Sequence, residues 1–153
     1  MANVAKGKPG GGAYSAGLRV LAFTLGLFFI FNALDKAAWI TDSGILEERL
    51  RGWLEQAAPP TRWYIETVAM PGVPLFARLV PVAELSAGAA LMLGFWTRLA
   101  AAVALVMVAN FHVARGFIFE PEFLIDGTAF PVLGGLLALA IGGSRLPLSA
   151  SRQ

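Results

Sequence analysis

A single carboxylate, Glu84, stands inside the apolar, small-residue stretch "PVAELSAGAALMLGFW". A charged side chain near the middle of a lipid bilayer costs about 2.5–3.5 kcal/mol on insertion scales, so Glu84 is expected to face a protein interior. There it either meets a hydrogen-bonding or charged partner or keeps its proton. Two roles fit such a group: a structural contact between helices, or proton exchange with a bound ligand. The residue types leave both open.

Other polar residues lie at matching depths in the neighbouring apolar stretches. Glu84 is roughly 14 Å from Leu75, where its stretch begins. Asn110 and His112 lie roughly 18 to 21 Å along the next stretch, which runs back in the opposite direction. Arg78 is a further candidate partner for Glu84. The sequence therefore predicts one intramembrane polar cluster, formed by Asn32, Asp35, Lys36, Glu84, Asn110 and His112.

His112 is the only histidine; a buried structural role is its first interpretation, and an axial ligand to a haem or chlorophyll the second. Two-histidine haem ligation within this chain is excluded, and the absence of cysteine excludes disulfides, thiol nucleophiles, iron–sulfur clusters and cysteine-ligated zinc. Asn32 and Asn110 fit hydrogen bonds between helices better than ligand contacts. The sequence predicts no metal site and disfavours haem and chlorophyll.

The composition indicates a membrane protein. Of the 153 residues, 57% are hydrophobic and only 14% are charged, against about 25% charged in a typical soluble domain. The formal net charge of +2 is small, and the basic residues do not alternate with aromatic ones as in nucleic-acid-binding proteins. No P-loop, nucleophile elbow or dinucleotide fingerprint is present. The expected surroundings are therefore a lipid bilayer and other membrane proteins, and not nucleic acid.

Four stretches approach the roughly 20 apolar residues that a spanning helix needs. They cover residues 18–34, 75–96, 99–114 and 127–143. Pro131 falls in the first turns of the fourth stretch, where its missing N–H costs little. The predicted fold is all-α: an integral membrane four-helix bundle. It occupies residues 17–146, between a flexible N-terminal tail of residues 1–16 and a C-terminal tail of residues 147–153.

The charged residues predict an orientation. With four spans, both termini and the turn between the second and third spans share one side of the membrane. That side carries the basic residues Lys6, Lys8, Arg19, Arg98, Arg145 and Arg152. The other side carries every acidic residue except Glu84. Because short cytoplasmic segments are enriched in Lys and Arg, both termini are expected in the cytoplasm.

The connection between the first two spans contains its own helical pattern. In "GILEERLRGWLEQ", apolar residues recur at helical spacing opposite charged ones. This predicts an amphipathic, extracytoplasmic helix. It either lies on the outer membrane surface or covers the ends of the spans or a partner protein.

Two motifs resemble the DoxX/DoxD family. Arg19 followed by "GLFFIFNALDK" resembles the opening of that family, and "LFARLVPVAELSAGAALMLGFWTRLAA" resembles its central signature. The resemblance covers residues 18–141, and the central motif is its most specific part. It departs from the family at Asn32, where a glycine is commoner. The residues carried over from the family motif are Arg19, Lys36, Glu84, Gly88, Gly94 and Arg98.

The resemblance implies a four-helix protein of a bacterial inner membrane, associated with quinone-linked or other redox complexes. The function expected first is that of a small membrane subunit of an electron-transfer complex, in an accessory or structural role. The long connection resembles the small subunit of thiosulfate:quinone oxidoreductase. One alternative is therefore a catalytic subunit that oxidises a small sulfur anion and reduces quinone. Another is a pigment-complex or scaffold subunit without chemistry. The sequence leaves open whether this chain is an enzyme.

Overall fold

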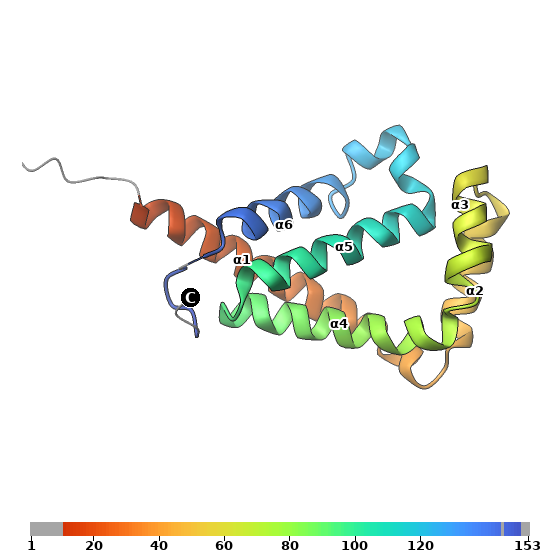
Figure 1. The fold of residues 1–153 in the computed structure, drawn as a ribbon, viewed down its shortest axis with the longest axis horizontal. Helices are drawn as coiled ribbons and strands as arrows, with labels where there is room; N and C mark the ends of the chain where they lie inside the picture. Colours follow the sequence, from red (N-terminus) through yellow and green to blue (C-terminus); the bar gives the residue numbers. More distant parts are fainter. Residues whose placement is uncertain (1–10, 145, 151–153) are drawn as a thin grey trace, which may run out of the picture.

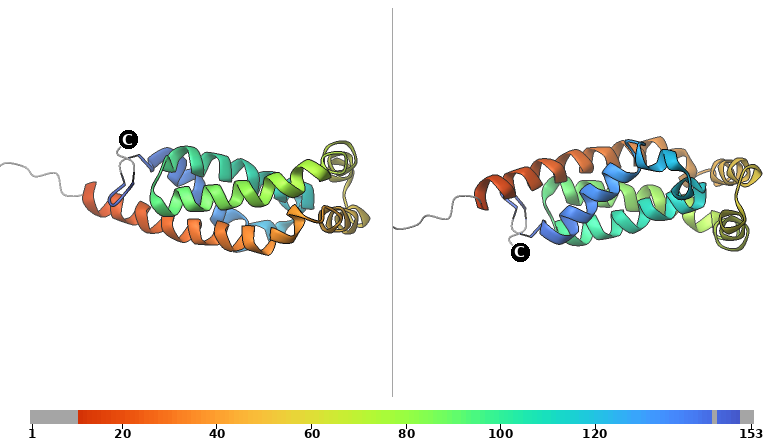
Figure 2. Two further views of the ribbon diagram at one scale, coloured as in Figure 1. Left: turned by 90° about the horizontal axis from the view of Figure 1, so that it is seen from below. Right: turned by 90° about the horizontal axis from the view of Figure 1, so that it is seen from above.

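The computed structural model describes residues 11–144 and 146–150, and within them it contains helices and turns but no strand. Four helices run side by side: α1 (Gly11–Asp35), α4 (Val73–Leu93), α5 (Thr97–Arg115) and α6 (Phe130–Gly142) (Figure 1). Two further helices, α2 (Gly44–Glu55) and α3 (Pro59–Tyr64), lie across one end of these four (Figure 2). We call this end the α2 end. The opposite end, where α1 begins and α6 finishes, is the terminal end.

Short helical segments connect the main helices. They are two 3-10 helices after α5 (Phe117–Phe119 and Pro121–Leu124), one 3-10 helix after α1 (Ala37–Ile40) and a π turn after α3 (Ile65–Ala69). The residues directly after α4 and α5 are Gly94 and Gly116, both in the left-handed conformation with φ of 68° and 75°. Glycine reaches this conformation without the steric cost that a Cβ adds.

Three helices, α1, α4 and α5, are long and apolar enough to cross a membrane. The fourth predicted stretch forms the shorter helix α6, whose 13 residues correspond to about 20 Å. Helix α6 starts at Phe130 and not at Gly127, because Asp126 accepts hydrogen bonds from the backbone and hydroxyl of Thr128 and holds the preceding residues in a turn. Pro131 occupies the first turn, as predicted. At the other end of the chain, α1 begins at Gly11, ahead of the predicted start of the first span.

The close contact between α1 and α4 depends on two glycines. A Cβ atom placed on Gly88 would lie 2.8 Å from the carbonyl oxygen of Gly26, and one on Gly26 would lie 2.7 Å from the carbonyl oxygen of Gly88. The two backbones therefore approach more closely than any larger residue would allow, as at other small-residue interfaces of membrane helices. Helix α5 packs on α4 and α6, and α6 also packs on α1.

A second apolar cluster lies beneath α2. Leu46 and Leu50 on α2 are buried against Trp39, Ile65 and Val73. Of the two interpretations of the amphipathic stretch, this packing matches the helix that covers the ends of the spans. The apolar face of α2 is thus occupied by the protein itself.

Candidate functional site

A buried ion pair joins the end of α1 to the middle of α4. The ammonium Nζ of Lys36 lies 3.0 Å from Oε1 and 2.9 Å from Oε2 of Glu84. The two residues are only 6% and 5% exposed. Lys36 is placed there because it directly follows the last residue of α1, at the α2 end. The carboxylate in the opening apolar stretch thus has a cationic partner, one of the candidates that the sequence offered.

Asn32 completes the coordination of the ammonium group. Lys36 Nζ donates to the Asn32 carbonyl oxygen at 3.1 Å and to its side-chain Oδ1 at 3.3 Å. The Asn32 amide in turn donates to the carbonyl oxygen of Phe28 at 2.9 Å. A glycine at this position would provide no side-chain acceptor, so the departure from the family pattern adds a polar contact to the buried pair.

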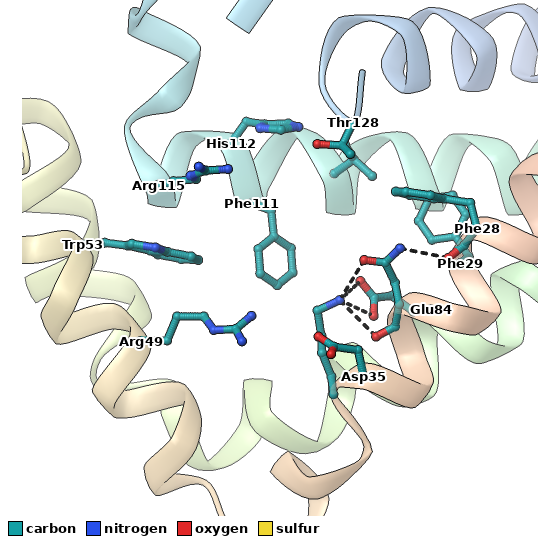
Figure 3. Close-up of a pocket in the computed structure, with 13 residues that line it drawn as sticks. Phe28, Phe29, Asp35, Arg49, Trp53, Glu84, Phe111, His112, Arg115 and Thr128 are labelled. Atoms are coloured by element: carbon teal, nitrogen blue, oxygen red, sulfur yellow. Dashed lines mark hydrogen bonds and ion pairs between the residues drawn. The ribbon is translucent and has the colours of Figure 1, made fainter. Parts of the chain in front are cut away.

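The ion pair borders a cavity of about 340 Å³ at the α2 end (Figure 3). Its wall combines aromatic rings with charged and hydrogen-bonding side chains from α1, α2, α4, α5 and the turn before α6. The lining residues are Phe28, Phe29, Asn32, Asp35, Lys36, Arg49, Trp53, Glu84, Val108, Phe111, His112, Arg115 and Thr128. Lys36 Nζ also lies 5.6 Å from the centre of the Phe111 ring, within the range of a cation–π interaction.

His112 contributes to the same wall from α5. Its ring is buried and packs edge-on against Phe123, with ring centres 5.4 Å apart, and beside Phe117 at 5.9 Å. Within the described residues, no group of three His, Asp or Glu side chains is arranged to hold a metal ion. The packing around the imidazole suits the structural interpretation of this histidine.

The structure brings five of the six predicted cluster residues to one cavity: Asn32, Asp35, Lys36, Glu84 and His112. It does not bring Asn110 there. The Asn110 side chain accepts a hydrogen bond from the Tyr64 hydroxyl and lines a separate, small cavity of about 50 Å³ under α2. Arg78 is exposed and donates to the carbonyl oxygen of Pro74, one turn earlier on its own helix, at 2.6 Å. Neither residue is a partner of Glu84.

Sequence reasoning missed several lining residues, above all Arg49, Trp53 and Arg115. Arg49 and Trp53 are one turn apart on α2 and therefore share a face. The helical pattern in the connection indicated that these two residues share a face. It did not indicate the tertiary position of α2, which turns this face toward the ends of the spans. Arg115 had no distinguishing pattern, since a basic residue is ordinary in the last turn of a helix.

The remaining family-motif residues lie away from the cavity, and two of them act at the terminal end. Arg19 donates to the carbonyl oxygens of Leu91 and Met92, the first at 3.1 Å, and Arg98 Nε donates to the carbonyl oxygen of Ala140 at 2.9 Å. The last carbonyl groups of a helix have no partner within it and carry partial negative charge. These arginines therefore close the ends of α4 and α6.

The motif residues thus have three roles. Gly88 allows the close contact between α1 and α4, Arg19 and Arg98 cap helix ends, and Lys36 and Glu84 form the buried ion pair. The DoxX family model matches residues 17–114 of this chain, which is more than half of its length. This chain belongs to the DoxX family. The matched range runs from within α1 to the last turn of α5 and hence includes the Lys36–Glu84 pair. No curated protein and no solved structure matches this DoxX protein.

Proposed function

We propose that this DoxX protein is a small membrane subunit of a quinone-linked electron-transfer complex, and that the cavity at its α2 end binds the quinone headgroup. The observation that carries the proposal is the composition of the cavity. Aromatic rings and a buried acid–base pair line one space at the end of the apolar helices. Ligand sites are typically apolar hollows with a few converging polar groups, which is the kind of wall that a quinone ring with two carbonyl oxygens fits.

The chemistry assigned to the chain is binding and proton supply. A quinone takes up two electrons and two protons to become a quinol. The electrons come from a redox partner subunit in the proposed complex. The Asn32 amide has a second N–H, beyond the one donated to Phe28, that is a hydrogen-bond donor for a quinone oxygen, and the Lys36–Glu84 pair provides titratable groups next to it. This DoxX chain then serves the redox partner by holding the quinone and handling its protons.

The accessory role is preferred over catalysis by this chain alone. Oxidising a sulfur anion through a covalent enzyme–sulfur intermediate would require a thiol, and the chain has no cysteine. The purified chain by itself should not support thiosulfate-dependent quinone reduction. Turnover by the chain alone would select the catalytic role, and a visible absorption band in the purified chain would select a pigment-binding one.

The proposed membrane arrangement is a four-helix bundle in a bacterial inner membrane with both termini in the cytoplasm. It is supported by the start of α1 and the end of α6, which both lie at the terminal end (Figure 1), and by the basic residues of that side in the sequence. Helix α2 and the cavity then face the extracytoplasmic side. A reporter enzyme fused after Gln153 should be active only if it is a cytoplasmic reporter. Activity of a periplasmic reporter there would overturn this orientation.

The quinone proposal is tested with the whole complex and the variant Glu84→Gln. The amide keeps an oxygen acceptor for Lys36 but cannot exchange a proton, so quinone reduction should fall by about a hundredfold while the complex still assembles. Ser86→Ala is the matched control, because Ser86 lies two residues further on α4, is exposed, and bonds only to the carbonyl oxygen of Val82 among the described residues. A Glu84→Gln complex with full stability and full turnover would eliminate the proton-handling role.

A further inference from the structure

Two arginines reach into the cavity without a charged partner. Arg49 of α2 and Arg115, the last residue of α5, both line it, and Figure 3 shows their side chains above and below Trp53. The Arg49 guanidinium lies 5.1 Å from the centre of the Trp39 ring, and that of Arg115 lies 4.7 Å from Phe117. Within the described part of the chain, neither guanidinium forms an ion pair or a hydrogen bond. Ten N–H donors are thus available beside one cavity.

The charges around the cavity leave a positive excess at these arginines. Lys36 and Glu84 satisfy each other at 2.9 Å. Asp35 is then the one remaining carboxylate that lines the cavity, and it is outnumbered by two guanidinium groups. Asp126, which is close enough to Arg115 to interact electrostatically, is already occupied by hydrogen bonds from Thr128. An anionic ligand would therefore be attracted to the space between Arg49 and Arg115.

The position of these arginines along the helices narrows the class of anion. Arg115 ends α5, and α2 lies across the ends of the apolar helices rather than among them (Figures 1 and 2). In a membrane, this is the depth at which the apolar spans give way to the lipid headgroups. Exposed Trp63 on the adjacent α3 is typical of that interfacial layer. The anion most abundant at this depth is the phosphate group of a phospholipid.

We propose that Arg49 and Arg115 hold the phosphate group of an anionic phospholipid at the mouth of the cavity. Planar guanidinium forks match phosphate oxygens through paired, charge-assisted hydrogen bonds. Trp53 lies between the two arginines in Figure 3 and Phe111 lies beside them, so the two rings offer apolar surface to the glycerol backbone. Both arginines are exposed side chains at the edge of the cavity, so the phosphate binds at its mouth and the acyl chains remain in the bilayer. Arg49 and Arg115 make none of the contacts assigned to the quinone, so this proposal does not depend on the quinone site.

Native mass spectrometry of the full-length protein in detergent tests the proposal directly. Phosphatidylglycerol and phosphatidylcholine with identical acyl chains are added separately, and bound lipid is counted. The unmodified protein should retain phosphatidylglycerol in preference to phosphatidylcholine. Each lost guanidinium should weaken phosphatidylglycerol binding by about fivefold, and the double variant Arg49→Gln/Arg115→Gln by about thirtyfold.

Two further variants keep the test independent of folding. Arg51→Gln removes a cation from the same helix, but Arg51 is exposed and paired with Glu47 at 2.6 Å, so lipid binding should stay unchanged. Arg49→Lys/Arg115→Lys keeps both charges, and it should retain the preference for phosphatidylglycerol with a loss smaller than that of the glutamine variants.

Three outcomes would overturn the proposal. One is equal phosphatidylglycerol binding by the double glutamine variant and the unmodified protein. Another is an equal loss in the Arg51→Gln control. The third is binding of inorganic phosphate that depends on Arg49 and Arg115 while neither lipid is retained, because the source would then be a free anion. Quinone binding is measured in parallel, so a failure of the quinone site is distinguished from a failure of the lipid site.

Discussion

Arginines occupy both ends of this molecule, but their surroundings differ. At the terminal end, Arg19 and Arg98 donate to backbone carbonyl oxygens at the ends of α4 and α6. At the α2 end, Arg49 and Arg115 lie over aromatic rings beside a cavity, without an ion pair or hydrogen bond in the described part of the chain. An arginine thus stabilises the fold at the terminal end, where its N–H groups bind backbone carbonyl oxygens. At the α2 end, the N–H groups of the arginines remain available to a ligand.

The two ends also differ in how the backbone is packed. At the terminal end, the chain turns tightly through Gly94, and the backbone N–H of Ala150 donates to the carbonyl oxygen of Leu93 at 2.9 Å. At the α2 end, the helices stay far enough apart to leave the cavity, and a separate helix covers them. Substitutions at the terminal end should therefore change stability alone. Substitutions around the cavity should change both stability and ligand binding.

The largest expected effect is at the buried ion pair. Glu84→Ala leaves Lys36 buried without a counter-charge and should lower the free energy of unfolding by about 3–5 kcal/mol. The double variant Lys36→Met/Glu84→Met removes both charges and should lose less than Glu84→Ala does. Thermal unfolding of the purified protein in detergent, followed by circular dichroism, gives both values. A double variant less stable than Glu84→Ala would contradict the assignment of the loss to an uncompensated charge.

A smaller loss is expected at the terminal end. Arg19→Gln gives up charge-assisted hydrogen bonds to two carbonyl oxygens and should lower the free energy of unfolding by about 1.5–3 kcal/mol. Arg78→Gln is the matched control on α4, because the hydrogen bond from Arg78 to the Pro74 carbonyl oxygen is exposed and lies within its own helix; it should change stability by less than about 0.5 kcal/mol. Quinone and lipid binding by Arg19→Gln should remain intact. If Arg19→Gln lost quinone or lipid binding without losing stability, the terminal end would not be purely structural, and the contrast with the α2 end would be contradicted.

The glycine contact between α1 and α4 provides the next test. Gly88→Ala adds a methyl group where a Cβ meets the Gly26 carbonyl oxygen at 2.8 Å and the Ile30 side chain at 2.9 Å. Overpacking of this kind should cost about 1–3 kcal/mol. Gly134→Ala is the control, since nothing lies within 4 Å of its added Cβ and alanine favours helix. Melting temperatures of the two variants should move in opposite directions, and equal losses would refute the close contact.

The smallest expected effect depends on pH. Hydrogen bonds from the Thr128 hydroxyl and backbone N–H hold the pKa of Asp126 below its ordinary value of 3.8. A lowered folded-state pKa stabilises the fold above pH 3.8, and this contribution is lost as the pH falls through the lower, folded-state pKa. The melting temperature of the unmodified protein should therefore exceed that of Asp126→Asn at neutral pH and approach it in acid. A constant difference at every pH would contradict this.

The sequence predicted the helical class, three of the spans and the burial of Glu84 with a polar partner, because hydropathy and the cost of a buried charge act locally along the chain. It could not choose Lys36 over His112, Arg78 or Asn110, since that choice depends on how the helices rotate about their axes. Hydropathy alone predicted that the fourth helix begins at Gly127. The start of α6, however, is decided by the Asp126–Thr128 turn. Arg49 and Trp53 entered the site only through the tertiary placement of α2.

The shortness of α6 has a consequence for the surrounding lipid. Its 13 residues cover about 20 Å, roughly 10 Å less than the hydrocarbon core of an ordinary bilayer. Such hydrophobic mismatch costs a fraction of a kcal/mol per Å, and it is relieved by local thinning of the bilayer or by oligomerisation. Leu137 and Ile141 on this helix are 50% and 70% exposed. In the proposed four-span arrangement, the lipid annulus would therefore be most deformed along α6, and a neighbouring subunit would replace lipid there at the least energetic cost.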